Sequence, residues 1–373
     1  NLKGRKYNSY WGFQGDEIRN SRQRRVEEPI LMLNHFWDLS ENTKINTNVA
    51  YQFGHIGNTR IDYGGTNLVR FNDEVSYEGG GQNPDPAYYQ NLPSYFLRSE
   101  GRENYEAAYK SAAAFRENGQ LNWQAIYDAN MAETNNGNNA VYALTADRYD
   151  DHSMYLNAIV DHTINAMFKL NGGINFRHLQ SHNYAKIDDL FGANHFLDID
   201  FFAEPINDYS LEQVAQSDVQ NPNRLVSQGD IYKYNYDLNA TSLQAFSQLQ
   251  FATKNIETYF SANVSSTSYE RFGNYQNGLF PDNSLGRSKE LNFIDFGLKS
   301  GITYHFTGRH SVSSNLFFAS NPPTLQNSFA NPRQNNTVVQ DLDSEQMYSV
   351  DATYRYRSPN FNFKVSGYFT QFR

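Results

Sequence analysis

Alternating apolar and polar residues recur along most of this 373-residue chain. In FNFKVSGYFTQFR (361–373), apolar side chains take most odd positions and polar ones most even positions. Successive side chains of a strand point to opposite faces, so the pattern predicts a strand with one apolar and one polar face. The same alternation marks these further segments: 45–53, 154–160, 168–177, 232–251, 256–265, 294–306, 312–318 and 350–356. The chain is therefore expected to be all-β, with about ten strands.

The segment 232–251 departs from a simple alternation. Its apolar residues stand at even positions as far as Leu238 and at odd positions from Leu243 onward. One additional residue in a strand shifts the alternation by one position, and a β-bulge supplies such a residue. A bulge near Ala240–Ser242 is therefore predicted.

The connections between these strands alternate in length. Short ones are expected near 40–44, 163–166, 254–255, 307–310 and 357–360. Long ones are expected at 55–139, 183–230, 271–289 and 320–345. An antiparallel up-and-down sheet with turns at one rim and elaborated loops at the other has this alternation, and it is typical of outer-membrane β-barrels. The apolar faces would then meet lipid, and the polar faces would line a wet interior.

Composition limits the alternatives. Aromatic residues make up 15% of the chain, far more than disordered chains contain, although the mean hydropathy is −0.72. No apolar run reaches the roughly 18 residues of a transmembrane helix. There are no cysteines, and the net charge of −9 argues against nucleic acid as a partner. A soluble all-β glycan-binding protein would explain each strand singly, but not the alternation of connection lengths.

The long connections amount to nearly half of the chain, which suggests a wide rim and a barrel larger than ten strands. The chain starts in loop-like sequence without a signal peptide and stops in or just after a strand. We therefore expect residues 1–373 to be a partial barrel from a longer protein.

Four segments carry a resemblance to a known family. They are EEPILMLNHFWDLSENTKINTNVAYQFG (27–54), NPDPAYYQNLPSYFLR (83–98), ASNPPTLQNSFANPRQNN (319–336) and YRYRSPNFNFKVSGYFT (354–370). Their order and spacing resemble the barrel domain of TonB-dependent outer-membrane receptors of Bacteroidota. The resemblance implies a 22-stranded transmembrane barrel, a plug domain inside it, and TonB-energised uptake of a nutrient. Neither a plug nor a TonB box is visible in this chain.

The resemblance also implies a cellular setting. The protein would lie in the cell outer membrane, contact the TonB–ExbB–ExbD complex through the absent plug domain, and take a small-molecule, glycan or peptide cargo. A surface lipoprotein is a possible partner. Basic residues near the start could contact lipopolysaccharide phosphates, although a solvated loop would equally explain them: Arg5, Lys6, Arg19, Arg22, Arg24 and Arg25. A plugless porin or structural outer-membrane protein is the alternative within the barrel class.

The loop 55–139 is expected to be extracellular and to carry a helical insert. Tyr105, Ala108 and Ala112 fall on one stripe of a helix that Gly119 can stop, and a second short helix is expected over 122–132.

Two groups of loop residues are candidate substrate contacts. Tyr88, Tyr89 and Tyr95 could stack on a sugar or grip a peptide, or they could pack loop against loop. A second group could face the mouth of the lumen or could serve turn formation: Asn321, Asn327, Arg333 and Asn335. No catalytic, metal-binding or cofactor-binding motif is present, since neither GxSxG nor HExxH occurs and Gly79–Gly81 lacks the features of a phosphate loop. We therefore expect no enzymatic activity.

Overall fold

The computed structural model describes residues 3–64, 66–71, 74–206 and 209–373. Its long strands are β4 (Ile30–Ser40), β5 (Thr43–Tyr63), β8 (Tyr142–Thr163), β9 (Phe168–Asp189), β12 (Ile231–Ala252), β13 (Ile256–Gly273), β15 (Leu291–His305), β16 (His310–Asn321), β17 (Glu345–Arg357) and β18 (Asn362–Phe372). The short strands are β1 (Trp11–Gln14), β2 (Glu17–Asn20), β3 (Arg24–Glu27), β6 (Thr66–Phe71), β7 (Glu74–Gly79), β10 (Phe196–Leu197), β11 (Leu225–Val226) and β14 (Gly286–Arg287). The helices are η1 (Tyr89–Asn91), α1 (Pro93–Phe96), α2 (Tyr105–Glu117), α3 (Trp123–Asn135), α4 (Leu211–Val214) and η2 (Leu325–Ser328).

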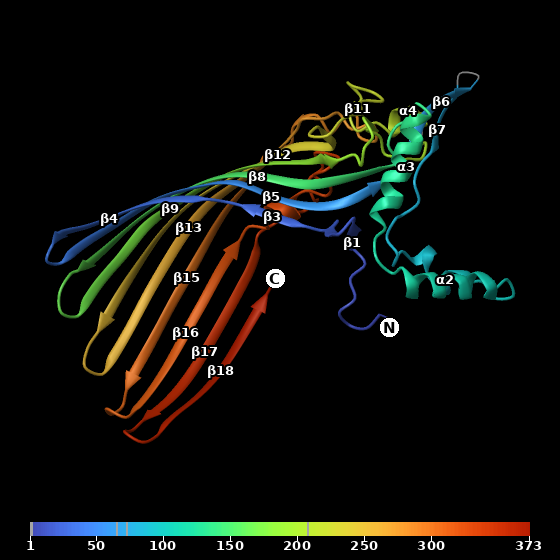
Figure 1. The fold of residues 1–373 in the computed structure, drawn as a ribbon. Coiled ribbons are helices and arrows are strands. Elements are labelled where there is room, and N and C mark those ends of the chain that lie inside the picture. Colours follow the sequence, from blue (N-terminus) through green and yellow to red (C-terminus); the bar gives the residue numbers. More distant parts are fainter. Residues whose placement is uncertain (1–2, 65, 72–73, 207–208) are drawn as a thin grey trace.

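The long strands form one antiparallel sheet in the order β18-β17-β16-β15-β13-β12-β9-β8-β5, and both β3 and β4 pair with β5 at the far edge. Each long strand therefore lies beside its neighbours in sequence, which is the up-and-down arrangement that the sequence predicts. The sheet curves like part of a barrel wall (Figure 1). Within the described residues, β18 and the β3–β4 edge do not pair with each other.

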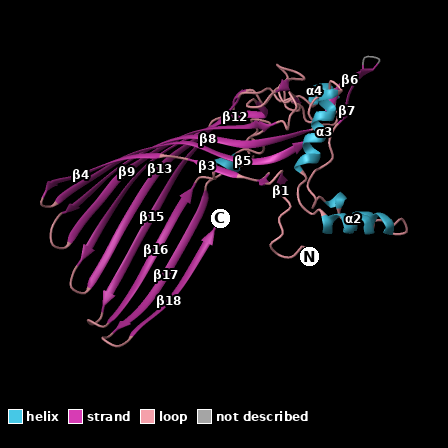
Figure 2. Ribbon diagram, viewed as in Figure 1, coloured by secondary structure: helices cyan, strands magenta, loops and turns pink. Residues whose placement is uncertain are grey.

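The two rims differ as predicted. Short turns join the strands at the lower end in Figure 2, whereas long connections leave the other end and carry all the helices of the described residues. The connection predicted at 55–139 is shorter than expected, because β5 stays paired with β8 up to Tyr63. Likewise, β9 runs on to Asp189 and so takes up the start, 183–189, of the connection predicted at 183–230. The sequence pattern did not predict that β5 and β9 extend this far, because the upper parts of these strands lack the alternation of apolar and polar residues found in the lower parts.

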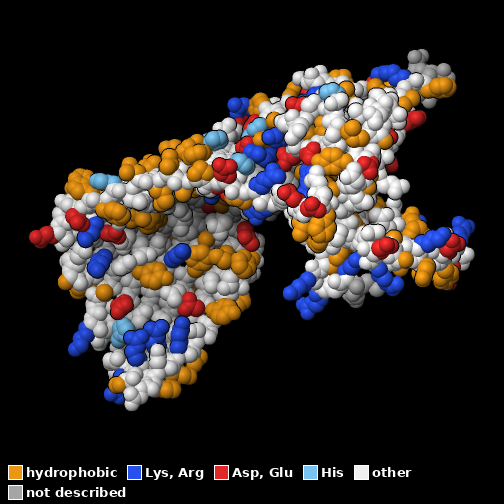
Figure 3. Space-filling view, viewed as in Figure 1, with side chains coloured by type: hydrophobic (Ala, Val, Ile, Leu, Met, Phe, Trp, Pro, Cys, Tyr) orange, Lys and Arg blue, Asp and Glu red, His pale blue; other side chains and the backbone are white. Residues whose placement is uncertain are grey.

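In the lower half of the sheet, the outward face is apolar. Phe260 is 55% exposed and Ile294 is 79% exposed, while the paired inward positions carry residues such as Ser261 and Lys299. The concave face in Figure 3 shows charged and other polar side chains with fewer hydrophobic ones. In β13 the apolar outward residues run from Ile256 to Val264, a length that suits the roughly 9–11 residues with which a tilted strand crosses a bilayer.

The upper half of the sheet reverses this pattern. In β12, Tyr236 and Leu238 face inward and are buried, whereas Leu243 and Leu249 face outward and are exposed. Tyr236, Leu238 and other apolar residues at inward upper positions belong to a core cluster against which parts of the long connections pack. Apolar residues thus change face along the strand because the covered side changes from the inside to the outside.

This reversal corrects the bulge that the sequence predicts. The pairing of β12 with β9 and with β13 runs without interruption through Ala240–Ser242. A register shift occurs instead between Tyr232 and Asn235, where Lys233 adopts a φ of 65°. The change from even to odd apolar positions therefore marks a change of surroundings and not an extra residue.

Two of the four helices described in the connection between β5 and β8, α2 and α3, match the segments that the sequence predicts. α2 and α3 each begin after an asparagine whose side chain accepts a backbone N–H: Asn104 from Ala107 and Asn122 from Ala125. None of the helices in the described part of the chain is long and apolar enough to cross a membrane.

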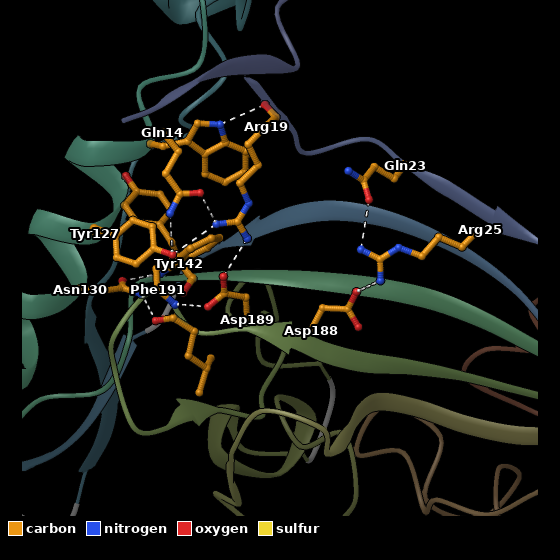
Figure 4. Close-up of polar contacts among 12 residues, drawn as sticks. Gln14, Arg19, Gln23, Arg25, Tyr127, Asn130, Tyr142, Asp188, Asp189 and Phe191 are labelled. Carbon is orange, nitrogen blue, oxygen red and sulfur yellow. Dashed lines mark hydrogen bonds and ion pairs between the residues drawn. The ribbon is translucent and has the colours of Figure 1, made fainter. Parts of the chain in front are cut away.

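Arg19 of β2 fastens the N-terminal hairpin to the upper rim (Figure 4). Its guanidinium carbon lies 4.4 Å from the ring centroid of Trp123 in α3 and 5.4 Å from that of Phe191. Its Nη2 donates a 2.7 Å hydrogen bond to Asp189 at the end of β9. In β3, the next strand along the chain, Arg25 pairs with Asp188 at 3.1 Å. These contacts join β2, β3, α3 and β9 into one polar and aromatic cluster.

Candidate binding site on the inner wall

A cavity of about 1000 Å³ lies between the inward face of the upper sheet and the connection 322–344, here called loop 322–344. We call it the wall cavity. Phe329 of this loop belongs to the buried core, and Leu325 and Val338 pack against it. The loop therefore folds back onto the wall rather than extending away from it. The wall cavity is lined by Tyr149, Leu179, Ser181, Asn183, Tyr236, Leu238, Leu325, Gln326, Asn327, Phe329, Ala330, Asn331, Pro332, Arg333 and Val339.

Two arginines converge on one carboxylate beside the wall cavity. Arg333 Nη2 lies 3.4 Å from Asp147 Oδ2, and Arg60 Nη1 lies 3.7 Å from the same oxygen. The other oxygen, Oδ1, accepts a 2.6 Å hydrogen bond from the Tyr234 hydroxyl. Arg333 also stacks on Tyr234, with its guanidinium carbon 4.7 Å from the ring centroid. Burial opposes the charge on Arg333, but Tyr234 and Asp147 outweigh it and raise its pKa.

A second carboxylate continues this network. Asp62 Oδ2 accepts hydrogen bonds from the Tyr232 hydroxyl at 2.8 Å and from Lys233 Nζ at 3.1 Å. Burial would raise the pKa of Asp62, but Lys233, the Tyr232 hydroxyl and Arg60 together lower it. We call the charged residues Arg60, Asp62, Asp147, Lys233 and Arg333 the wall network.

Arg271 of β13 lies buried behind the cavity and is 2% exposed. Its Nε donates to the Pro332 carbonyl at 2.7 Å, and its Nη1 donates to the Ser284 carbonyl at 3.0 Å and to Asn336 Oδ1 at 2.5 Å. Among the described residues it forms no ion pair with a carboxylate. Burial lowers the pKa of its guanidinium to about 10, so it still carries its charge at neutral pH.

The structure brings together only part of the second predicted group. Asn327 and Arg333 both line the wall cavity. Asn321 lies at the exposed end of β16, opposite Glu345 of β17. Asn335 is buried, and its side chain accepts a 2.9 Å hydrogen bond from the Thr337 N–H, which is turn chemistry. Asn321 and Asn335 are absent from the cavity lining among the described residues.

The three predicted tyrosines lie elsewhere, in the segment of η1 and α1 beside α2. Tyr88 and Tyr89 meet edge to face at 4.8 Å between ring centroids, and Tyr89 and Tyr95 do so at 5.6 Å. Arg98 covers the ring of Tyr95 at 3.5 Å. Tyr89 nevertheless keeps 56% of its surface exposed. The tyrosines thus pack on one another, and none of them lines the wall cavity.

Sequence reasoning missed most of the wall network. Arg60, Asp147 and Lys233 fall in parts of the strands whose inward residues look like those of a soluble sheet. Tyr232 and Tyr234, on either side of Lys233, could have indicated a polar site. Tyrosines at alternate positions of a strand place their hydroxyl groups on the same face. The separation of Arg60, Asp147 and Arg333 in sequence hid their proximity.

The fold and these features define a class. The sheet is part of the wall of a transmembrane antiparallel β-barrel of the up-and-down type, with an apolar outer band, a polar interior, and long loops at one rim.

Several solved structures are similar to this chain in fold. The copper transporter OprC matches 95% of the chain with a TM-score of 0.54 at 11% sequence identity, and the chain spans 40% of the length of OprC. The siderophore receptor PiuA from Acinetobacter baumannii matches 96% of the chain (TM-score 0.48, 11% identity), and the chain spans 41% of it. The ferric-catecholate import receptor Fiu from E. coli K12 matches 92% (TM-score 0.46, 9% identity), and the chain spans 40% of it. No protein-family model and no curated protein matches the sequence.

Proposed function

We propose that this chain is part of the barrel of an outer-membrane receptor that takes up a nutrient with energy supplied by TonB. The observation that carries the proposal is the wall cavity, which lies above the apolar band, on the inward face, beneath a loop folded against the wall. A passive pore has no need for such a partly enclosed, polar and aromatic pocket at its mouth. The fold shared with OprC supports a barrel that admits a specific cargo.

In this proposal, cargo binds first in the wall cavity. Arg333 and Asn327 offer polar contacts, and Tyr149 and Tyr236 offer hydroxyls beside aromatic surface. Tyr88, Tyr89 and Tyr95 remain proposed contacts of a second kind, because exposed rings such as that of Tyr89 can meet a cargo before it enters. TonB, ExbB and ExbD would act through a plug domain outside residues 1–373.

Two further partners are proposed at the membrane surface. Lipopolysaccharide phosphates would meet outward-facing cations above the apolar band, such as Lys186 of β9. A surface lipoprotein would cover the long loops. Gentle detergent extraction of the native receptor, followed by mass spectrometry of what co-purifies, tests both partners at once.

Uptake in intact cells tests the proposed function. Deleting the full-length gene should abolish uptake of one nutrient class from a panel of glycans, peptides and metal chelates. The same loss should appear in wild-type cells that lack TonB or are treated with a protonophore. Continued uptake in cells without TonB, together with ion conductance of the purified protein in planar bilayers, would instead indicate a passive porin.

A further inference from the structure

We propose that the wall cavity selects an organic anion, that is, a carboxylate or phosphate group attached to an apolar or aromatic body. This inference names a cargo class and rests on the proposed function, in which the wall cavity is the cargo site. Three observations support it: the balance of charges around the cavity, the exposure of Arg333 to the cavity, and the apolar side chains in the lining.

The charges around the cavity do not balance. The wall network holds three cations but only two carboxylates, Asp62 and Asp147. Buried Arg271 adds a fourth cation that forms no ion pair within the described residues. Asp151, the next inward position of β8 below Tyr149, is a third carboxylate, and one positive charge still remains in excess among these residues. This excess occurs in a chain whose net charge is −9.

Arg333 presents this excess charge to the cavity. Its side chain keeps 40% of its surface exposed, and it shares Asp147 with Arg60 at distances longer than those of a close ion pair. It is the only charged side chain among the described residues that line the cavity. A guanidinium presents a planar fork of donors that matches a carboxylate or a phosphate. Because Arg333 shares Asp147 with Arg60, part of its planar set of N–H donors remains free for an incoming anion.

The remaining lining suits an apolar body. Leu179, Leu238, Leu325, Phe329 and Val339 surround the space beside Arg333. Burying apolar cargo surface there removes it from water, which contributes affinity that an inorganic anion would lack.

Ligand titration tests this inference without energy coupling. Full-length receptor in nanodiscs is titrated with phenyl phosphate, benzoate, benzyl alcohol and benzylamine, and binding is followed by saturation-transfer NMR against empty nanodiscs. We expect at least one of the two anions to bind roughly tenfold more tightly than benzyl alcohol, and benzylamine to bind most weakly. The comparison of benzoate with phenyl phosphate then identifies which anionic group the site prefers.

Variants connect the binding to Arg333. Arg333→Gln should weaken binding of the preferred anion roughly tenfold, and Arg333→Lys should restore part of it. Arg287→Gln is the matched control, because Arg287 pairs with Glu270 on the outward face and should leave binding unchanged. Equal affinities for the anions and for benzyl alcohol, or undiminished anion binding by Arg333→Gln, would overturn the inference while energised uptake could still hold. Anion binding without any nutrient uptake would overturn the proposed function alone.

Discussion

Arg271 of β13 holds the residue that directly precedes Arg333, since its Nε donates a 2.7 Å hydrogen bond to the carbonyl oxygen of Pro332. A buried cation of the wall thereby fixes the backbone from which the guanidinium of the cavity extends. The same side chain reaches Ser284 and Asn336, so it joins the two connections that follow β13 and β16.

Replacing Arg271 by Met should loosen loop 322–344. The change removes three hydrogen bonds and leaves buried carbonyl groups without a donor, so we expect the opening free energy of this loop to fall by about 2–3 kcal/mol. Hydrogen exchange of peptides covering 330–338 in the full-length protein measures this change. Arg287→Met removes an exposed ion pair on the outward face and should change exchange by less than about 0.5 kcal/mol. Equal protection of the loop in the wild type and in Arg271→Met would contradict the role of Arg271.

The two faces of β13 should respond differently to a charge. Phe260 lies in the middle of the apolar outward band, and its neighbour Ser261 faces inward. Arginine at 260 should cost about 2–4 kcal/mol of folding free energy in a bilayer, whereas arginine at 261 should cost much less. Urea titration of the full-length protein refolded in lipid vesicles gives both values. If the two variants were equally destabilised, the assignment of lipid to the outward face would be wrong.

The hydroxyl group of Tyr236 should lose its proton only at strongly alkaline pH. Burial raises its pKa to about 12, although Arg333 and Arg271 partly oppose the rise. Because the folded pKa lies above the ordinary value of 10.0, the stabilisation is complete below pH 10 and is lost as the pH rises through about 12.

Absorbance at 295 nm, as the difference between wild type and Tyr236→Phe, isolates this titration from the other tyrosines. Arg333→Gln should move the midpoint higher still, because it removes a positive charge that favours the phenolate. A midpoint near pH 10 would mean that the phenol is solvated and the cavity wall open.

Arg19→Gln should release the N-terminal hairpin from the rim. The substitution removes the ion pair with Asp189 and the contacts with the rings of Trp123 and Phe191, which together are worth about 1–2 kcal/mol. Hydrogen exchange over 11–20 should increase accordingly. Arg25→Gln is the comparison, since the side chain of Arg25 is 56% exposed in its pair with Asp188 and should matter little. Similar effects of both changes would show that the aromatic contacts of Arg19 add nothing.

The barrel wall could be predicted from sequence because its lower half obeys one rule. Wherever a strand separates lipid from the interior, residues such as Phe260 and Ser261 alternate in polarity, and at the lower rim the turns between such strands are short. Strand ends could not be predicted equally well. The last part of β5, up to Tyr63, pairs with β8 but has no lipid on either side, so its sequence carries no such alternation.

The candidate site was predicted only in part, for a related reason. Arg333 could be singled out because a lone cation in an asparagine-rich loop is conspicuous. Its partner Asp147 lies in a strand, separated from Arg333 by about half the chain, and no periodicity connects the two. The bulge was predicted at the wrong place for a similar reason. An extra residue and a change of the buried face both shift apolar residues from even to odd positions, so the sequence does not distinguish them.

The reversal of faces along β12 determines the height at which the wall cavity lies. Leu243 of β12 and Ile294 of β15 both lie opposite Ser266, so they mark one level at which the greasy exterior ends. Tyr236 stands seven residues higher, which is roughly 20 Å along the strand. The upper strands therefore extend above the bilayer and place the wall cavity beyond the headgroup layer. In the proposed function, cargo would therefore bind from the surrounding solution before it reaches the plane of the membrane.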